Sequence, residues 1–471
     1  MSSASGMIAE SRVGRGRRSY EPLRALRAVV VLVVVGYSVL HLGYSLFHYS
    51  IFSDRAVSGD TYRAFLETIE WKRTGTLPPS TVLYPPLYYL ILLPLTNLEF
   101  QDVARVLYFT QFILYYFSVI LMGKAASETG TSSAMDYLIV AVLTVNFQPF
   151  LETLAMHKVE GIELFLICLA IYTFRRKKDV LTGSLVCVAA NLKYLPGILG
   201  VYFLLKREFK VVRGILGMLL FCLIILIPAF GISGLWTYVI QHPLMLLFGH
   251  HYEGTRPEAS LEFQTLTGTI NRLFVGSTGM VEHIRTSGYV HVPHAQLAFL
   301  IAAILKIGLT GFWIYLIRRS WRVSQRDTQW VFYLLEISLT LILIFVIAPS
   351  SRIHYAILLL PAFVITGLVL FHNPHVFQWE EKLLFALSYS LTAVIIPGGL
   401  LNRLLPPSPI WGHNYSLAYF WMSLPFYGYL ILGFCIILCY KRLCRSRGSQ
   451  SFSGNLSCSP SQLMTPSLPP R

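Results

Sequence analysis

Charged residues are scarce in this chain: Asp, Glu, Lys and Arg together make up 13% of its 471 residues. Soluble domains carry about 25%, so the composition excludes an ordinary water-soluble domain. Apolar residues account for 55%, and the mean hydropathy is +0.59. Apolar runs of about 17 to 25 residues recur along the chain, the length that a helix needs to cross about 30 Å of hydrocarbon. Short alternating strands, the pattern of outer-membrane barrels, are missing, so we expect an all-α polytopic membrane protein.

None of the seven cysteines falls in the large loops that we expect on the extracytoplasmic side of the membrane. A disulfide framework is therefore not expected. No group of cysteines and histidines has the spacing of zinc ligands, and the loop histidines form no helical pair with a carboxylate. A glycine-rich phosphate-binding loop is missing too. We expect neither a metal nor another cofactor.

An internal repeat is also missing, although many transporters are built from two related halves. Ionisable residues deep inside the apolar runs are few, with Glu163 and Glu336 the main ones. Pumps and antiporters usually carry more of them. Both absences disfavour a flippase or a transporter of a lipid-linked or small polar substrate, which stays open as an alternative.

Acidic residues number 23 against 38 basic ones, which gives a formal net charge of +15. The basic residues gather in short clusters at every second end of the apolar runs, the pattern that marks cytoplasmic loops. The excess charge therefore predicts topology, and we expect no nucleic-acid partner. The clusters are Arg12–Arg27, Arg175–Lys178, Lys206–Arg213, Arg318–Arg326 and Lys441–Arg447.

These clusters predict about twelve membrane helices with both termini in the cytoplasm. The segments within 161–206 are too short for upright spans and predict tilted or broken helices inside the bundle. The segment 85–98 begins with a Pro-Pro pair and is also too short to cross, so we expect a re-entrant or interfacial helix. The spans are expected at roughly 25–47, 104–124, 135–150, 161–174, 179–192, 196–206, 214–230, 296–317, 330–349, 353–371, 382–401 and 417–440.

The predicted organisation has a basic cytoplasmic segment at 1–24, a transmembrane domain at 25–440 and a disordered cytoplasmic tail at 441–471, rich in Ser and Pro. Two large outside loops are expected at about 48–85 and 231–294. Polar and aromatic residues concentrate in them, so we expect the working face to lie outside.

Asp60 stands in the first outside loop, where a segment with helical apolar spacing begins. A carboxylate at the outer edge of a membrane is well placed to take a proton from a substrate hydroxyl. Asp is equally a favoured helix N-cap. The two roles are compatible, because a capping carboxylate still presents an oxygen to a substrate.

Lys193 lies between two apolar segments at an outside end, against the positive-inside trend. Its ammonium group suits a phosphate at headgroup depth, although a lysine that snorkels to the interface is the alternative. Arg352 and His354 stand at another outside end and supply donors for a phosphate or for sugar hydroxyls. An interfacial histidine with a snorkelling arginine is the alternative there. Weaker candidates for the same cavity are His157, Lys158, Glu160, Glu262, Gln264, Asn271 and Arg272.

Four motifs occur in order along residues 25–370. The first motif lies in the first outside loop and contains Asp60 and Tyr62, followed by Tyr84-Pro85-Pro86. The second is Lys193-Tyr-Leu-Pro196, which follows the basic turn Arg175–Lys178. The third is Thr265-Leu-Thr-Gly268, which leads to Arg272, and the fourth is Pro349-Ser-Ser351, which leads to His354. With them the chain resembles the polyprenol-phosphate-mannose-dependent alpha-mannosyltransferase family of the GT-C superfamily, which includes bacterial phosphatidylinositol-mannoside mannosyltransferases. It departs from that pattern at His157–Glu160 and at Arg352, which leaves the donor sugar and the acceptor open.

The resemblance implies a GT-C-type fold and an inverting transfer of a hexose, most of all mannose, from a polyprenyl-phosphate sugar to a lipid or glycan acceptor. Asp60 would be the general base, and Lys193 and His354, with Arg272 or Arg352, would stabilise the leaving phosphate. Tyr62 and Tyr84 complete the expected substrate site. The implied location is a bacterial inner membrane, or the endoplasmic reticulum as its counterpart. Transfer of arabinofuranose, glucose or another sugar is the nearest alternative.

Overall fold

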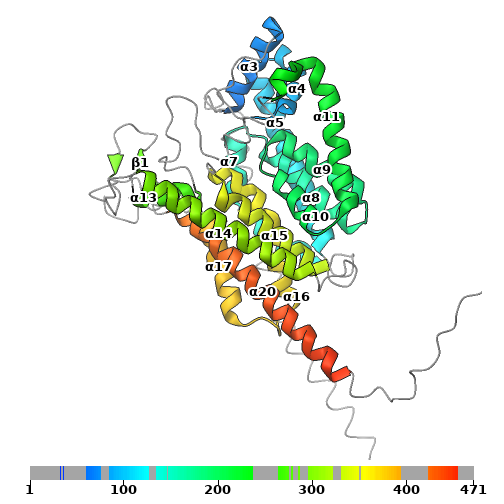
Figure 1. Ribbon diagram of the computed structural model, residues 1–471, viewed down its shortest axis with the longest axis vertical. Helices are drawn as coiled ribbons and strands as arrows, with labels where there is room; N and C mark the ends of the chain where they lie inside the picture. Colours follow the sequence, from blue (N-terminus) through cyan, green and yellow to red (C-terminus); the bar gives the residue numbers. More distant parts are fainter. Residues whose placement is uncertain are drawn as a thin grey trace, which may run out of the picture.

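Figure 1 shows the computed structural model, an assembly of helices with a single short strand pair among the residues that it describes. The structure describes residues 32, 36, 60–75, 84–126, 134–145, 147–236, 264–274, 277–278, 285–286, 295–321, 330–348, 352–393 and 423–454.

The helical elements follow one another with short connections wherever consecutive residues are described. Strands β1 (Ser277–Thr278) and β2 (Arg285–Thr286) pair antiparallel. The helices are α3 (Asp60–Thr74), α4 (Pro86–Leu92), η2 (Leu93–Asn97), α5 (Phe100–Ala126), α6 (Ala134–Val145), α7 (Gln148–Ala155), α8 (Glu160–Arg175), α9 (Asp179–Leu192), α10 (Gly197–Leu205), α11 (Phe209–Trp236), α13 (Leu266–Phe274), α14 (Ala295–Trp321), α15 (Trp330–Ile347), η5 (Ile353–Leu359), α16 (Leu360–His372), α17 (Trp379–Ala393) and α20 (Leu424–Gly454).

Six segments within the described residues are long and apolar enough to cross a membrane, which confirms a polytopic membrane protein. A seventh is added if the bent pair α6 and α7 counts as one span. The predicted number of about twelve stays a prediction, since most of 25–47 and 394–422 lies outside the described residues. The six segments are Phe100–Ala126, Phe209–Ile232, Leu300–Arg319, Trp330–Ile347, Ile353–His372 and Leu424–Arg445.

Two expectations differ from the structure. The single span expected at 135–150 is instead bent by 57° between α6 and α7. Pro149 explains the break, because a proline cannot continue a preceding helix but fits the first turn of a new one. The second difference is at the C-terminus, where α20 continues to Gly454 through residues expected to form a disordered tail. Arg442 contributes to that continuation, since it forms an ion pair with the buried Glu381 of α17.

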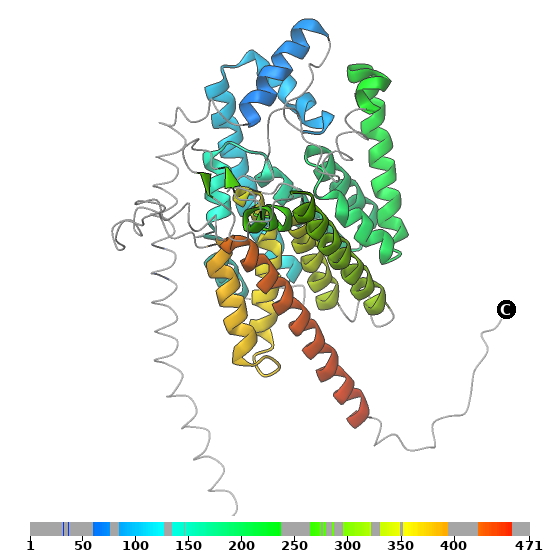
Figure 2. The ribbon, with the colours of Figure 1, turned by 60° about the vertical axis from the view of Figure 1, so that its left-hand side comes forward.

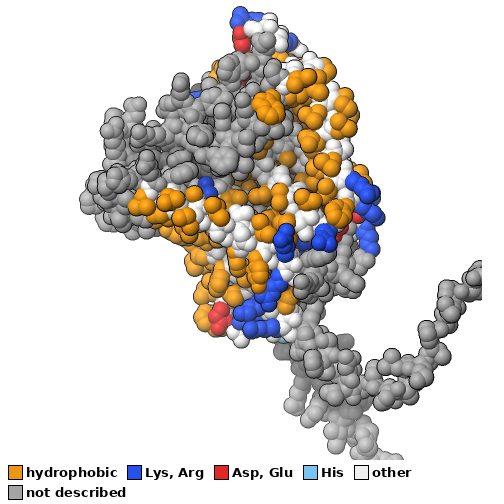
Figure 3. All heavy atoms as spheres, viewed as in Figure 1, with side chains coloured by type: hydrophobic (Ala, Val, Ile, Leu, Met, Phe, Trp, Pro, Cys, Tyr) orange, Lys and Arg blue, Asp and Glu red, His pale blue; other side chains and the backbone are white. Residues whose placement is uncertain are grey.

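The core lies around α15 and α16. In the most apolar 18-residue stretch of each segment, 89% of α15 and 94% of Ile353–His372 is buried, against 11% for α11 and 17% for α14. A helix that is apolar on all sides belongs in the core of a bundle or against lipid, and both cases occur here. Figure 3 shows the apolar side chains of α11 and α14 on the surface, with Lys and Arg side chains gathered below them.

Glu336, one of the two carboxylates expected inside a span, has a structural partner. Its Oε2 lies 3.0 Å from Lys206 Nζ and accepts a hydrogen bond of 3.1 Å from the hydroxyl of Tyr202. All three residues are buried. Because a buried charge needs a partner, this contact ties the end of α10 to the middle of the core helix α15.

Helices α8, α9 and α10 are short, with 16, 14 and 9 residues. At 1.5 Å per residue they measure about 24, 21 and 14 Å, less than the thickness of a bilayer, whereas residues 209–230 of α11, before the non-helical Gly231, measure about 33 Å. The prediction that 161–206 cannot form upright spans is therefore confirmed. In Figure 1, α3 and α4 lie beyond one end of these short helices, beside the far end of α11.

Two glycines let α9 and α11 approach closely. A Cβ atom added to Gly183 would lie 2.0 Å from the carbonyl oxygen of Val211, and one added to Gly214 would lie 2.1 Å from that of Val180. Both contacts are with backbone, which cannot rotate away as a side chain can. Small residues at such positions allow helices to pack tightly in a membrane.

We expect Gly183→Ala to lower the stability of the protein by about 3 kcal/mol, because overpacking forces two helix backbones apart. Thermal unfolding of the purified protein in detergent measures this. Gly217→Ala, on the same helix α11 as Gly214, is the matched control, since a Cβ there meets nothing within 4 Å. Equal melting temperatures for the two variants would show that the close approach is not needed.

Candidate active site

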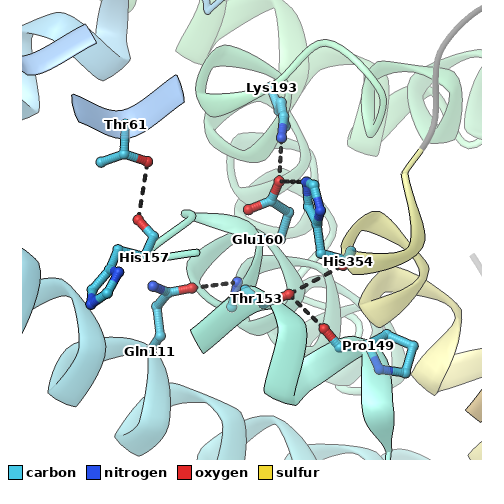
Figure 4. A network of polar contacts seen from close by, with 9 residues as sticks. Thr61, Gln111, Pro149, Thr153, His157, Glu160, Lys193 and His354 are labelled. Carbon is cyan, nitrogen blue, oxygen red and sulfur yellow. Dashed lines mark hydrogen bonds and ion pairs between the residues drawn. The ribbon is translucent and has the colours of Figure 1, made fainter. Parts of the chain in front are cut away.

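The carboxylate of Glu160 joins three separate segments of the chain. Glu160 is the first residue of α8, Lys193 directly follows α9, and His354 belongs to η5. Lys193 Nζ donates a hydrogen bond to Glu160 Oε1, and His354 Nε2 lies 3.5 Å from the same oxygen (Figure 4). All three side chains are buried. We call these three residues the Glu160 cluster.

Local sequence explains why Lys193 points inward. Pro196 stands at the start of α10, and because its nitrogen carries no hydrogen it cannot bond to the carbonyl oxygen of Leu192, the last residue of α9. The backbone at Lys193 is accordingly extended, with φ −154° and ψ 137°, while its N–H still bonds to Ala189. The chain therefore turns between two short helices, and the lysine at the turn points into the bundle.

His354 is held by the tight turn η5 and by a contact from α7. The hydroxyl of Thr153 donates to the carbonyl oxygen of His354 at 3.2 Å and to that of Pro149 at 2.8 Å. Neither ring nitrogen of His354 makes a hydrogen bond to a described residue. A buried histidine that is fixed through its backbone, and whose Nε2 borders the Glu160 carboxylate without a hydrogen bond, is available to a ligand.

Two aromatic rings complete the surroundings of Lys193. Its Nζ lies 3.7 Å from the ring centroid of Tyr355 and 5.5 Å from that of Tyr84. The faces of aromatic rings attract cations. Burial alone lowers the pKa of Lys193, but Glu160 and neighbouring groups raise that pKa above its ordinary value. The lysine is therefore a permanent positive charge at neutral pH.

Three cationic side chains act on His354. The charges of Lys158, Lys193 and Arg352 all act on its ring. Glu163 lies one turn after Glu160 on α8; it is buried, and neither of its carboxylate oxygens bonds to a described residue. Lys158, Lys193 and Arg352 thus bring positive charge to one buried ring, and cationic side chains bind anionic ligands such as a phosphate.

The start of α3 lies against the turn that precedes Glu160. Thr61 Oγ1 donates to the carbonyl oxygen of His157 at 3.0 Å (Figure 4). His157 has a positive φ of 52°, and burial lowers the pKa of its imidazole. Helix α3 begins at Asp60, so the backbone of Asp60 is adjacent to this contact. The side chain of Asp60 lies outside the described part of the chain.

The other predicted site residues are distributed over the bundle. Tyr84 joins the Glu160 cluster through Lys193, and Arg352 is half-buried beside His354. The ring of Tyr62 packs on Phe100, with centroids 4.8 Å apart.

Arg272 is buried on α13, and its Nη2 donates to Ser423 Oγ at 2.6 Å. Burial lowers the pKa of this arginine to about 10. No contact among the described residues links Arg272 to the Glu160 cluster. Of the weaker candidates, Gln264 and Asn271 are buried at or beside α13, and Glu262 lies outside the described residues.

From the sequence, Glu160 was predicted as a weaker candidate for the cavity and not as the central residue of the site. The available signal was an acidic residue directly before an apolar helix, with Glu163 on the same helical face one turn later. Its pairing with Lys193, 33 residues away, and with His354, almost 200 residues away, is not visible in any local pattern.

A family model described as Glycosyltransferase family 87 matches residues 82–349, more than half of the chain. The match contains Glu160 and Lys193 and ends shortly before His354. A comparison with curated proteins finds no match. The expected glycosyltransferase class is thereby confirmed, and the chain is a membrane glycosyltransferase.

We expect Lys193→Gln to lower stability by about 3–5 kcal/mol, because it leaves the carboxylate of Glu160 buried without its partner. The double variant Glu160→Gln/Lys193→Gln should lose much less than the sum of the two single variants, since neither charge remains. Thermal unfolding of all four proteins measures the coupling. Arg73→Gln, which breaks an exposed ion pair with Glu70, should leave the melting temperature unchanged. Additive losses in the buried pair would contradict the assignment.

Proposed function

Because the chain belongs to glycosyltransferase family 87, we propose that it transfers a hexose, mannose in the first place, from a polyprenyl-phosphate sugar to a hydroxyl of a lipid or glycan acceptor. We further propose that the fold is of GT-C type and that the reaction takes place on the extracytoplasmic side. The observation that carries the proposal is the Glu160 cluster: a buried lysine beside a buried histidine whose ring nitrogens make no hydrogen bond to a described residue.

Depth supports a lipid-linked donor. The Glu160 cluster lies at the ends of α8 and α9, which measure about 24 and 21 Å from the basic turn that joins them. It is therefore recessed below the far surface of a bilayer about 30 Å thick. A phosphate attached to a polyprenyl chain can reach this depth while its chain stays among lipid and helices. A soluble nucleotide sugar would have to leave water to do so.

The leaving group explains the use of Lys193 and His354. As the bond between the anomeric carbon and the phosphate oxygen breaks, negative charge grows on the phosphate. Fixed donors in a dry site stabilise such charge strongly. Lys193 supplies a permanent cation, and the ring nitrogens of His354 make no hydrogen bond to a described residue.

Glu160 balances the charge of Lys193 in the free enzyme. Without a ligand, its carboxylate is the counter-ion of Lys193 and fixes the direction of the ammonium group. When the donor binds, its phosphate takes over part of that role. We therefore assign Glu160 as a positioning residue, with an effect mainly on donor binding.

Asp60 remains the proposed general base. The hydroxyl of the acceptor gives its proton to the Asp60 carboxylate and attacks the anomeric carbon from the face opposite the phosphate, so the configuration inverts. The contact of Thr61 with His157 supports this role, because it anchors the start of α3 three residues before Glu160. Tyr84, which borders Lys193, would contact the donor on the same side.

The test is transfer by the full-length protein in liposomes with radiolabelled polyprenyl-phosphate mannose, glucose or arabinofuranose and a membrane lipid extract as acceptor. We expect transfer from one of these donors. Asp60→Asn should lower kcat about 10²- to 10⁴-fold, the usual contribution of a general base. His354→Asn should lower it about 10²- to 10³-fold, whereas Glu160→Gln should act mainly on KM.

Lys72→Gln is the matched control, since Lys72 stands at the opposite end of α3 from Asp60 and contacts only Thr96 and Asn97 among the described residues. Its transfer rate should equal that of the wild type. Full activity of Asp60→Asn would exclude Asp60 as the base. A wild-type protein that moves lipid-linked sugar across the liposome without transferring it would instead favour the flippase alternative.

A further inference from the structure

A second polar site lies at the other end of the bundle. The segment Ile353–His372 carries His354 near its first residue and leads, roughly 30 Å further on, to the turn between α16 and α17. A cavity of about 640 Å³ is found beside this turn. We call it the α20 pocket; its lining residues are His375, Val376, Gln378, Leu438, Lys441, Arg442 and Arg445.

One wall of the pocket is a single face of α20. Leu438, Lys441, Arg442 and Arg445 are spaced i, i+3, i+4 and i+7, so they follow one another along the helix surface. The opposite wall is the α16–α17 turn with His375, and α17 packs along α20 (Figure 2). The stripe on α20 changes from apolar at Leu438 to basic at Arg445.

An ion pair between half-buried Arg442 and buried Glu381 holds the two walls together. Arg442 Nε pairs with Glu381 Oε1, and Arg442 Nη2 donates to Gln378 Oε1 at 2.9 Å. The backbone N–H of Gln378 donates to Glu381 Oε2 at 3.0 Å. Arg442 is therefore neutralised and serves as framework. Lys441 and Arg445 are exposed and form no ion pair with a described residue, so two positive charges remain for a ligand.

The shape and the charge favour one chemical class. The volume lies within the range of small-molecule sites, about 300–1,000 Å³. A second cavity of about 590 Å³, between α6, α16 and α17, has an apolar lining with Lys382 as its one charged residue, as far as the structure describes it. Two free cations beside an apolar stripe therefore distinguish the α20 pocket. That combination suits an amphiphile with an anionic head and acyl chains.

We propose that the α20 pocket binds the headgroup of an anionic phospholipid in the leaflet that borders the basic end of the bundle, with the phosphate between Lys441 and Arg445. The acyl chains run along Leu438 toward the membrane interior. Binding bridges α20 to the α16–α17 turn and stabilises the folded protein by mass action. The site is independent of the sugar-transfer reaction, because it lies at the opposite end of the bundle from the Glu160 cluster.

A simpler explanation for the basic residues Lys441 and Arg445 is that they only orient the helix in the membrane by the positive-inside rule. A matched pair of variants separates the two explanations. Lys441→Gln/Arg445→Gln removes both free charges of the pocket. Arg318→Gln/Arg319→Gln removes the same number of charges from the basic end of α14, outside the pocket.

The experiment uses the full-length protein in nanodiscs of phosphatidylcholine, without and with phosphatidylglycerol, and measures lipid retention by native mass spectrometry together with the melting temperature. We expect the wild type and the α14 variant to retain phosphatidylglycerol in preference to phosphatidylcholine and to melt higher in its presence. The pocket variant should bind phosphatidylglycerol about 30-fold more weakly and lose the shift. Lys441→Arg/Arg445→Lys, which keeps the charges, should behave like the wild type.

Three outcomes would overturn the proposal. They are no preference for phosphatidylglycerol in the wild type, an equal loss in the α14 variant, and an equal rise in melting temperature with inorganic phosphate in discs of phosphatidylcholine alone. The last would indicate a free-phosphate site instead of a lipid site. Because sugar transfer is not measured, failure here leaves the proposed enzymatic function untouched, and failure of that function leaves this site untouched.

Discussion

A charge inside a membrane protein needs a counter-charge, and two such pairs fix the architecture of this chain. Lys193 stands four residues before α10 and pairs with Glu160 of α8, while Lys206 directly follows α10 and pairs with Glu336 of α15. The nine-residue helix α10 is thus held at both ends. Since removing one member of a buried pair is costly, neither end of α10 can shift without losing an ion pair.

The two pairs nevertheless have different surroundings. Glu336 accepts from both Lys206 and the hydroxyl of Tyr202 through Oε2, while its Oε1 makes no hydrogen bond to a described residue. The Glu160 cluster adds a buried imidazole whose two ring nitrogens make no hydrogen bond to a described residue, and the charges of Lys158 and Arg352 also act on that ring. Buried polar atoms left in this state are unfavourable unless a ligand completes them. This contrast separates a structural ion pair from a candidate site.

Much of this protein could be predicted from local patterns. Composition and apolar run length identify a polytopic membrane protein, and run length also shows that 161–206 cannot form upright spans. Unusual charges at span ends pointed to Lys193 and His354, because such charges break the surrounding apolar pattern. Arg272 was a weaker candidate in the second outside loop, and its guanidinium bonds to Ser423, 151 residues away. A local pattern shows that a charge needs a partner but does not identify the partner.

Ion pairs between distant segments of the chain could therefore not be predicted from local sequence patterns. The sequence by itself determined the membrane class, the short helices and the basic ends, because hydropathy and helix length act within a single segment. Only the tertiary structure decided that Glu160 stands between Lys193 and His354 and that Glu336 pairs with Lys206. It also decided that Leu438, Lys441 and Arg445 face the α16–α17 turn. These contacts join segments far apart along the chain, and they form because buried charges must find each other when the helices pack.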